Sequence, residues 1–396
     1  MSSGKHIVII GGGTAGVTIA ARLRRADSTL QVTIIDPATR HYYQPLWTLV
    51  GAGLARFEET DRAMKDLIPS GVTWRQAEVA RVAPEQGEVL LTDGAKVAYD
   101  ALVVTPGLRL AFEEVEGLVD ALEHDPRVWT NYSLEYVKKG VGALAAFKGG
   151  RAFFSFPNSP VKCGGGPQKI MWVVEDILRE QGRREGAEVH FVASGAAIFG
   201  VPKYREALER LVQERDIHTH FQQHVVAVDR ARGEVVIEDL QTKARRAERY
   251  DLLHVTPPQR AFPWIKESGL GDAAGFVDVN RETMQHARFP NVFSAGDAAN
   301  LPTAKTGAAV RKQAPALVAN LVAFLRGQAA PAHYNGYTSC PLVVSQRHVI
   351  LAEFGYDGAI LESFPFEQAV PRRSMYVLKR HLLPVMYWQG MLKGRA

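Results

Sequence analysis

The sequence predicts an α/β protein with two Rossmann-type domains in tandem and a C-terminal segment of a different kind. Three observations predict this fold. A glycine-rich turn joins an apolar strand to a helix within residues 5–26, a second strand–loop–helix–strand unit begins near residue 151, and a later apolar strand ends on Gly-Asp at 296–297. Apolar runs bounded by glycine that alternate with helical periodicity are typical of parallel sheets covered by helices. The expected domains are 1–110 together with 270–330, then 111–269, and finally 331–396.

Composition limits the class of protein. The chain has 396 residues, of which 46% are hydrophobic and 22% charged, as in ordinary globular domains. No apolar run reaches the ~18 residues of a transmembrane helix, and the N-terminal residues lack the regions of a secretory signal. Two cysteines are too few for a disulfide scaffold or a structural zinc site, so we expect no metal. The net charge of +5 fits nucleic acid, an anionic membrane or neither, and its distribution decides among them.

The elements of the first domain follow from the hydrophobic pattern. Residues 5–10 predict a buried strand, residues 14–26 have helical periodicity, and residues 31–35 predict a second strand, so that the three form a βαβ unit. A further buried strand is predicted at 100–104, and shorter strand-like pieces such as 88–92 lie before it.

The second domain repeats this pattern. A buried strand is predicted at 151–156, a loop rich in Pro, Asn and Gly follows at 157–167, and a helix then runs from 169 to 184. The next strand is predicted at 188–193. We expect the remaining strands of this domain in two pieces, 224–238 and 250–256.

The glycine-rich turn has the pattern Gly11-x-Gly13-x-x-Gly16. Between a strand and a helix, such glycines allow a tight turn and let the backbone approach a pyrophosphate at the helix N-terminus. Asp36 lies 20 residues after Gly16, where a carboxylate hydrogen-bonds ribose hydroxyls and disfavours a 2′-phosphate. The pattern therefore predicts an ADP-containing dinucleotide, either NAD or FAD.

The Gly296-Asp297 motif favours FAD. In flavoproteins that bind two dinucleotides, such an aspartate binds the ribitol or phosphate side of FAD, whereas the alternative is that Asp297 only caps the next helix. That helix is predicted from about 307 to 326, and its N-terminus would stabilise negative charge on the reduced flavin ring. Lys305 either adds to this effect or is a solvated loop residue. The expected FAD-binding residues are Gly11, Gly13, Ala15, Gly16, Asp36, Gln44, Val79, Thr105, Gly107, Gly296, Asp297, Lys305 and Thr306.

The second domain lacks a second glycine fingerprint. Where flavin reductases that use pyridine nucleotides carry GxGxxG, this chain reads SFPNSPVKCGGGPQK. Cys163 thus stands at a strand-to-helix junction, near a helix N-terminus that stabilises a thiolate, and Lys162 and Lys169 add positive charge. Because Cys340 is the only other cysteine, a redox pair beside the flavin is the simplest interpretation. Two inert buried thiols are the alternative.

Four segments carry a resemblance to a known family. They are HYYQPLWTLVGAG at 41–53, FPNSPVKCGGGPQKIMW at 156–172, FSAGDAANLPTAKTGAAVRKQAP at 293–315 and GYTSCPLV at 336–343. These segments closely resemble the sulfide:quinone oxidoreductases, most strongly the mitochondrial-like type, and the likeness covers most of the chain. The resemblance implies a tandem Rossmann fold of the disulfide-reductase kind with a membrane-associating C-terminal region. Many bacterial members have a third cysteine that can bond FAD, and its absence here implies non-covalent FAD.

The resemblance also implies a mechanism. Cys163 and Cys340 would form a disulfide or a sulfur-bridged trisulfide beside the flavin, and hydrosulfide would attack it, leaving a persulfide on one cysteine. The released thiolate passes two electrons to the flavin, which reduces ubiquinone or a related quinone. The sulfane sulfur leaves to glutathione, sulfite or another sulfide. Asp120 and Glu123 lie where a family carboxylate assists, with a solvated surface position as the alternative for each.

The tail from 371 to 396 contains basic residues and no acid. The basic residues are Arg372, Arg373, Lys379, Arg380, Lys393 and Arg395, with apolar and aromatic residues between them. Such a segment is typical of an interfacial anchor on anionic lipid, so part of the basic charge is explained without nucleic acid. A packed C-terminal helix or a dimer contact is the alternative. We expect the protein on the cytoplasmic face of the inner membrane, with its oligomeric state open and with quinone candidates Phe354, Tyr356, Tyr387 and Trp388.

Three other functions remain to be compared with this one. A flavocytochrome c-type sulfide dehydrogenase uses the same chemistry of two redox-active cysteines, but it needs export to reach its haem subunit. An NADH:quinone reductase is disfavoured by the missing second fingerprint and by Cys163. A flavin redox sensor would respond to sulfide without turnover.

Overall fold

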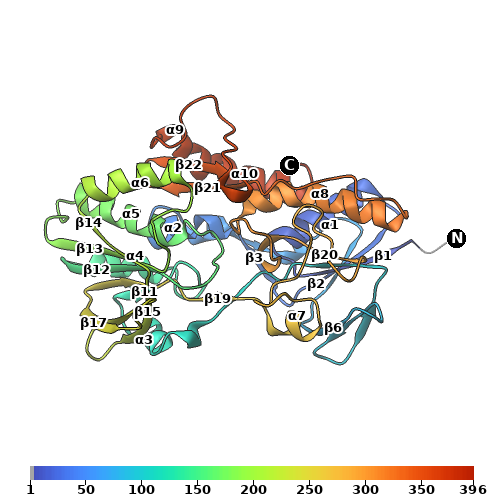
Figure 1. The fold of residues 1–396 in the computed structure, drawn as a ribbon, viewed down its shortest axis with the longest axis horizontal. Helices are drawn as coiled ribbons and strands as arrows, with labels where there is room; N and C mark the ends of the chain where they lie inside the picture. Colours follow the sequence, from blue (N-terminus) through green and yellow to red (C-terminus); the bar gives the residue numbers. More distant parts are fainter. Residues whose placement is uncertain (1–3) are drawn as a thin grey trace.

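The computed structural model describes residues 4–396, and it contains two α/β domains that lie side by side along the long axis (Figure 1). The N-terminal domain is built on a five-stranded sheet with strand order β20-β9-β1-β2-β5, in which every pairing is parallel. Its strands are β1 His6–Ile10, β2 Gln31–Ile35, β5 Val72–Arg75, β9 Ala101–Val104 and β20 Val292–Ser294.

Two long helices cover this sheet. Helix α1 (Thr14–Ala26) follows β1 directly, and α8 (Gly307–Leu325) packs against it although nearly 300 residues separate them. The chain therefore leaves this domain after β9 and returns to it at β20. A small antiparallel sheet flanks it, made of β6 Val79–Ala83, β7 Glu88–Leu91 and β8 Lys96–Ala98.

The second domain contains another parallel five-stranded sheet, with order β11-β18-β12-β13-β14. Its strands are β11 Val128–Trp129, β18 Leu252–His254, β12 Gly150–Phe156, β13 Ala187–Ala193 and β14 Ile217–Phe221, and its main helices are α5 Gly166–Glu180 and α6 Pro202–Glu214. The two sheets are consistent with tandem Rossmann domains.

One sequence-based assignment in this domain is wrong. The piece 224–238 does not join the parallel sheet, but forms β15 (Gln223–Asp229) and β16 (Glu234–Asp239), which make a separate antiparallel sheet with β17 (Arg245–Arg249). The pattern of β16 gives the physical reason, because buried and half-buried residues alternate along it, as in strands with one face on the core. The edges of the parallel sheet are instead formed by β11 and β14.

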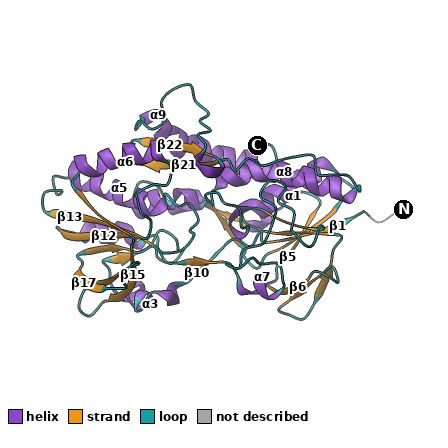
Figure 2. Cartoon of the chain, in the orientation of Figure 1, coloured by secondary structure: helices purple, strands orange, loops and turns teal. Residues whose placement is uncertain are grey.

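The C-terminal segment crosses both domains on the side of α6 and α8 (Figure 1). It begins with an antiparallel hairpin of β21 (Thr338–Val343) and β22 (Val349–Phe354). Short helical turns follow (Figure 2), namely α9 Arg373–Val377, a π-helical turn Leu378–Leu382, α10 Leu383–Val385 and the turns Met386–Gly390 and Met391–Lys393. In residues 4–396, no helix combines the length and the apolar character that crossing a membrane requires.

The remaining elements are short connections. They are β3 Arg40–Tyr42, α2 Trp47–Gly51, β4 Asp61–Ala63, β10 Arg109–Leu110, α3 Leu118–His124, α4 Lys139–Ala146, β19 Gln259–Arg260 and α7 Pro263–Glu267, with 3-10 turns Gln44–Leu46, Phe57–Thr60, Met64–Asp66, Phe112–Glu114, Gly296–Ala298 and Tyr356–Gly358. Strands β10 and β19 pair with each other where the chain passes between the two domains.

Candidate functional site

The glycine-rich turn leaves an open space at the N-terminus of α1. A Cβ atom on Gly11, whose φ is +94°, would collide with the Thr105 carbonyl, and one on Gly16 would collide with the Gly11 carbonyl. A Cβ on Gly13 would meet nothing within 4 Å, and this residue caps α1 without any side-chain hydrogen bond. Free backbone N–H groups at an open helix N-terminus fit a pyrophosphate. Ala15 lies in this first turn.

Asp36 closes the same site from the end of β2. Its carboxylate accepts hydrogen bonds from the backbone N–H of Gly12 at 2.5 Å and of Ala38 at 2.7 Å, and burial raises its pKa. Thr105 donates its hydroxyl to the Ile10 carbonyl at 2.9 Å, which holds the end of β9 against the turn. Of the other expected residues, Gly107 has a φ of +76°, Val79 is buried in β6, and Gln44 is exposed.

Asp297 lies beside the N-terminus of α8 but does not cap it. The cap is Thr306, whose hydroxyl accepts the Ala309 N–H at 3.0 Å. Asp297 is largely buried, and this burial raises its pKa. Lys305 donates to the carbonyl of Asp297 at 2.8 Å, and burial lowers the pKa of Lys305 to about 8. Gln313, which the sequence did not single out, accepts the Gly296 N–H at 2.8 Å.

Cys163 has an unusual backbone conformation in the loop before α5. Its φ is +55°, in the left-handed region that side chains other than glycine seldom adopt, and such strain concentrates at functional sites. Three contacts hold it: its N–H donates to the Lys305 carbonyl at 2.7 Å, and its carbonyl accepts from Gly166 N–H at 2.6 Å and from the Tyr132 hydroxyl at 3.3 Å. The loop is therefore fixed to both domains.

The two cysteines lie together, and a buried lysine contacts them. Cys340 is buried in β21, and the Lys169 ammonium donates to the Cys163 sulfur at 3.0 Å. The pKa of Cys163 lies well below its usual range. The hydrogen bond from Cys340 and the charge of Lys169 lower it, and together they outweigh burial, which raises it. The same interaction with Cys163 raises the pKa of Cys340 far above its usual range. These shifts favour the thiolate form at Cys163 and the protonated form at Cys340.

Two further lysines with lowered pKa values lie near the thiols. Burial lowers the pKa of Lys162 to about 8, while Asp297 opposes this shift. Burial and the charge of Lys169 lower the pKa of Lys379 to about 7, and both thiols oppose this shift. Lys379 was assigned from sequence to the membrane tail. It is instead 3% exposed and donates to the Pro45 carbonyl at 2.5 Å.

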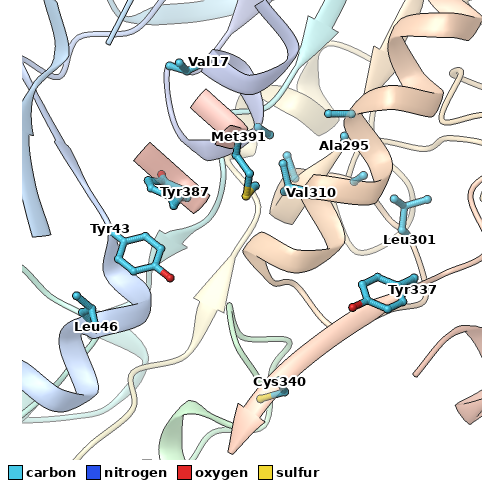
Figure 3. Close-up of a cluster of buried hydrophobic side chains, with 14 of the residues drawn as sticks. Val17, Tyr43, Leu46, Ala295, Leu301, Val310, Tyr337, Cys340, Tyr387 and Met391 are labelled. Carbon is cyan, nitrogen blue, oxygen red and sulfur yellow. The ribbon is translucent and has the colours of Figure 1, made fainter. Parts of the chain in front are cut away.

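The tail is packed onto the glycine-rich domain more than its composition indicates. Figure 3 shows Tyr387 facing Tyr43, with Met391 beside them. The Tyr387 hydroxyl bonds His41 Nε2 at 2.5 Å and Thr14 at 2.8 Å, and burial lowers the pKa of His41 to about 4. Trp388 contacts Tyr387 with ring centroids 5.0 Å apart.

The other two quinone candidates lie elsewhere. Phe354 contacts Phe199, and it lines a cavity of about 500 Å³ that also exposes Lys305. Tyr356 contacts Tyr334 and donates to the Arg281 carbonyl at 2.5 Å. Within residues 4–396, no aromatic contact joins either residue to the Tyr387–Trp388 pair.

The exposed part of the tail is smaller than expected. Val377, Leu382 and Val385 are 47%, 57% and 59% exposed, whereas Met391 and Leu392 are buried and Arg380 forms an ion pair with Glu59 at 2.8 Å. Part of the segment is therefore packed against the protein, as the packed-helix alternative expects, and part of it is exposed.

The carboxylate candidates Asp120 and Glu123 are on the surface. Their side chains are 53% and 50% exposed, and Asp120 pairs with Arg230 at 2.8 Å. Each therefore occupies the solvated position that was the alternative. Among the described residues, no group of His, Cys, Asp and Glu side chains has the geometry to hold a metal ion.

Comparisons with known proteins agree with this geometry. The sequence pattern of the pyridine nucleotide-disulphide oxidoreductase family matches residues 5–320. The chain is 41% identical over 390 residues to a mitochondrial sulfide:quinone oxidoreductase of Mus musculus, covering 98% of this chain and 86% of that protein. It is 41% identical over 392 residues to the mitochondrial sulfide:quinone oxidoreductase of Dictyostelium discoideum, with the same coverage.

A solved structure shares the fold. The sulfide:quinone oxidoreductase of Aquifex aeolicus superposes with a TM-score of 0.82 at 20% sequence identity, over 99% of this chain and 92% of that one. At this sequence identity the solved structure supports the fold alone, and the two mitochondrial relatives support the family assignment. The chain belongs to the sulfide:quinone oxidoreductase family, within the pyridine nucleotide-disulphide oxidoreductases.

Proposed function

We propose that this protein oxidises sulfide to sulfane sulfur with the thiols of Cys163 and Cys340 and passes the two electrons to a quinone. The observation that carries the proposal is the contact of these two cysteines with Lys169 at the junction of the domains, in a chain 41% identical to a sulfide:quinone oxidoreductase over 98% of its length. Buried thiols without such a cation would be inert, because only the thiolate is nucleophilic.

The two cysteines have different roles in a disulfide exchange. In the oxidised enzyme the Cys163–Cys340 disulfide accepts hydrosulfide at one sulfur, and the other leaves as a thiolate. The shifted pKa values favour Cys163 as the leaving thiolate, because Cys340 holds its proton more tightly. Lys169 stabilises the negative charge that appears on Cys163.

The residues of the first domain fit FAD as the electron carrier, held without a covalent bond. The proposed FAD domain comprises 1–110 with 270–330. The open N-terminus of α1 at Gly13 would hold the pyrophosphate, Asp36 the ribose and Asp297 the ribitol side, and the N-terminus of α8 lies next to Asp297. FAD held by these residues would supply two-electron redox chemistry between the thiols and the quinone. Lys305 and Lys162 add positive charge beside Asp297.

The quinone site and the membrane attachment are inferred from the C-terminal tail and its aromatic residues, and the sulfur acceptor is inferred from the chemistry of persulfides. We place the quinone, ubiquinone or a close relative, against Tyr387 and Trp388 or against Phe354 and Tyr356. The exposed Val377, Leu382 and Val385, with Arg372 and Arg373 nearby in sequence, support peripheral attachment to an anionic membrane. Glutathione, sulfite or a second sulfide would remove the sulfane sulfur.

An anaerobic titration tests the proposal. Sulfide is expected to bleach the oxidised flavin band of the purified protein, and a short-chain quinone to restore it, whereas NADH should leave the band unchanged. Cys163→Ser and Cys340→Ser should each abolish bleaching without loss of bound flavin. Bleaching by NADH but not by sulfide would contradict the proposal and favour an NADH:quinone reductase.

A further inference from the structure

Trp129 and His254 project to one face of the sheet of the second domain, and two more polar residues, Asn131 and Thr256, follow them closely in the chain. Trp129 and His254 are directly paired across the parallel strands β11 and β18, so their side chains project to the same side. Asn131 lies two residues after Trp129, and Thr256 lies two residues after His254. In extended chain, residues two apart share a face, which favours the same side for Thr256 and His254, whereas Asn131 lies in a turn after β11. The Asn131 N–H donates to His254 Nε2 at 3.1 Å, which joins the two pairs.

These side chains are buried, but several of their polar atoms have no partner. Trp129, His254 and Thr256 are at most 1% exposed, and Asn131 is 8% exposed. Among residues 4–396, no hydrogen-bond partner exists for Trp129 Nε1, His254 Nδ1, Thr256 Oγ1 or either side-chain atom of Asn131. His254 accepts a hydrogen bond at Nε2, so the proton of its neutral ring is on Nδ1. This N–H is therefore a buried donor without an acceptor.

The inner end of this row reaches the thiol loop. Gln259, which is fully buried, accepts the Lys162 N–H at 3.0 Å through Oε1, while its Nε2 has no partner within the described chain. Tyr132, which follows Asn131, donates its hydroxyl to the Cys163 carbonyl. The unpartnered atoms thus begin next to the residues that hold Cys163.

The outer end of the row lies between α2 and α4. A Cβ atom on Gly51, the last residue of α2, would collide with Asn131 Oδ1. One on Gly140 of α4 would collide with the Gly51 carbonyl and lie 2.7 Å from Trp129 Nε1. The glycines bring these two helices onto the polar side chains, and Gly53, two residues beyond α2, is exposed. This group of polar side chains therefore contacts the thiol loop through Gln259 and contacts α2 and α4 through Asn131 and Trp129.

Leaving so many buried polar atoms unpaired would be costly. Each unsatisfied buried group destabilises the fold, and native proteins satisfy such groups with ordered water. Side chains with a purely structural role on this face would be apolar, as Phe154 is on the neighbouring strand β12. We propose that Asn131, His254, Thr256 and Gln259 hold a row of water molecules through which the thiol site exchanges protons with solvent.

The inference rests on the proposed function for its chemical role. When hydrosulfide bonds to one cysteine sulfur, the disulfide bond breaks and its electron pair leaves on the other sulfur as a thiolate. Sulfide that arrives as H2S must first lose a proton to become the attacking hydrosulfide, and this proton has to leave the site. Cys340 is buried and Cys163 is partly exposed, so a route through the protein interior would serve the buried side of the thiol site. The polar row supplies that route.

The test compares Thr256→Val with Thr256→Ser in the FAD-loaded enzyme. Valine keeps the shape of threonine but removes the unpartnered hydroxyl, whereas serine keeps it. We expect Thr256→Val to unfold at the same or a lower temperature than the parent protein. Anaerobic bleaching of its flavin by sulfide should slow by roughly tenfold, at the low end of the effect of a lost proton-transfer step. Added imidazole buffer should restore part of the rate. Thr256→Ser should match the parent protein.

Two results would overturn the inference. One is a Thr256→Val protein that unfolds at a higher temperature and bleaches at the parent rate. The higher unfolding temperature would show that the buried hydroxyl binds no water, because its removal then stabilises the folded protein. The other is a high-resolution crystal structure of the parent enzyme without ordered water on these four side chains, which decides the question even if the variant does not fold. If sulfide fails to bleach the parent enzyme itself, the proposed function fails, whereas unchanged rates in the variants defeat the water row alone.

Discussion

Gly165 and Cys340 are packed so closely that a methyl group on Gly165 would lie 2.5 Å from the Cys340 sulfur. The same methyl group would lie 2.6 Å from Leu342 Cδ2, because β21 passes directly over the loop that leads into α5. The absence of a side chain at Gly165 is therefore what lets Cys340 approach Cys163.

Gly165→Ala should separate the two thiols. Real Cβ atoms do not come within 3.0 Å of such neighbours, so the loop or β21 must shift. After mild oxidation, the denatured variant should still show two titratable thiols, whereas the parent protein should show none. Gly164→Ala is a matched control, because its Cβ would meet nothing within 4 Å, and it should oxidise normally. Normal disulfide formation in Gly165→Ala would contradict this account.

Lys169→Met should raise the pKa of Cys163. The ammonium lies 3.0 Å from the Cys163 sulfur and stabilises its thiolate, so its loss makes the thiolate less abundant at pH 7. Each unit of pKa increase lowers the thiolate fraction about tenfold once the pKa exceeds the pH. The pH profile of iodoacetamide alkylation of the reduced enzyme measures this shift. Lys148→Met, at an exposed position, should leave the profile unchanged, and an unchanged profile in Lys169→Met would refute the role of the lysine.

Glu175→Gln should strongly destabilise the second domain. The carboxylate is fully buried in α5 and pairs with Arg179 at 2.5 Å, Arg184 at 3.4 Å and Arg215 at 3.1 Å. Removing its charge leaves partly buried guanidinium groups uncompensated, at a cost of roughly 3–5 kcal/mol. Denaturant unfolding measures the loss. Glu113→Gln removes an exposed partner of Arg109 and should cost less than about 1 kcal/mol. Equal losses of unfolding free energy in the two variants would show that the buried ion-pair cluster contributes no more stability than an exposed ion pair.

Leu382→Asp combined with Val385→Asp should release the protein from membranes. Both side chains are more than half exposed on the tail, where they can enter the interface of a bilayer. Co-sedimentation with vesicles that contain anionic lipid should fall, while sulfide should still bleach the flavin of the soluble variant. Val119→Asp, on the exposed face of α3, serves as the control and should bind vesicles like the parent protein. Binding that persists in the double variant would place the attachment site elsewhere.

The elements that local patterns specify were predicted closely. Helix α1 and strand β2 have the predicted limits, and β1, β9, β12 and β13 differ from prediction by one residue at most. Their apolar runs and flanking glycines act within one segment, so the sequence alone contains the signal. The prediction for 224–238 failed for the opposite reason, since which sheet a strand joins depends on partners far away in the chain.

The sequence by itself determined the chemistry of this protein: a glycine turn for a dinucleotide, two cysteines, and basic residues near one of them. Only the tertiary structure decided which of these residues act on each other. It moved Lys379 from the membrane tail to the thiols, brought Tyr132 and Gln313 to the site, and placed the buried Gln259 against Lys162 beside Cys163. The physical reason is that a thiolate is set by the charges and hydrogen bonds within a few ångströms of it, and folding brings those groups from segments hundreds of residues apart.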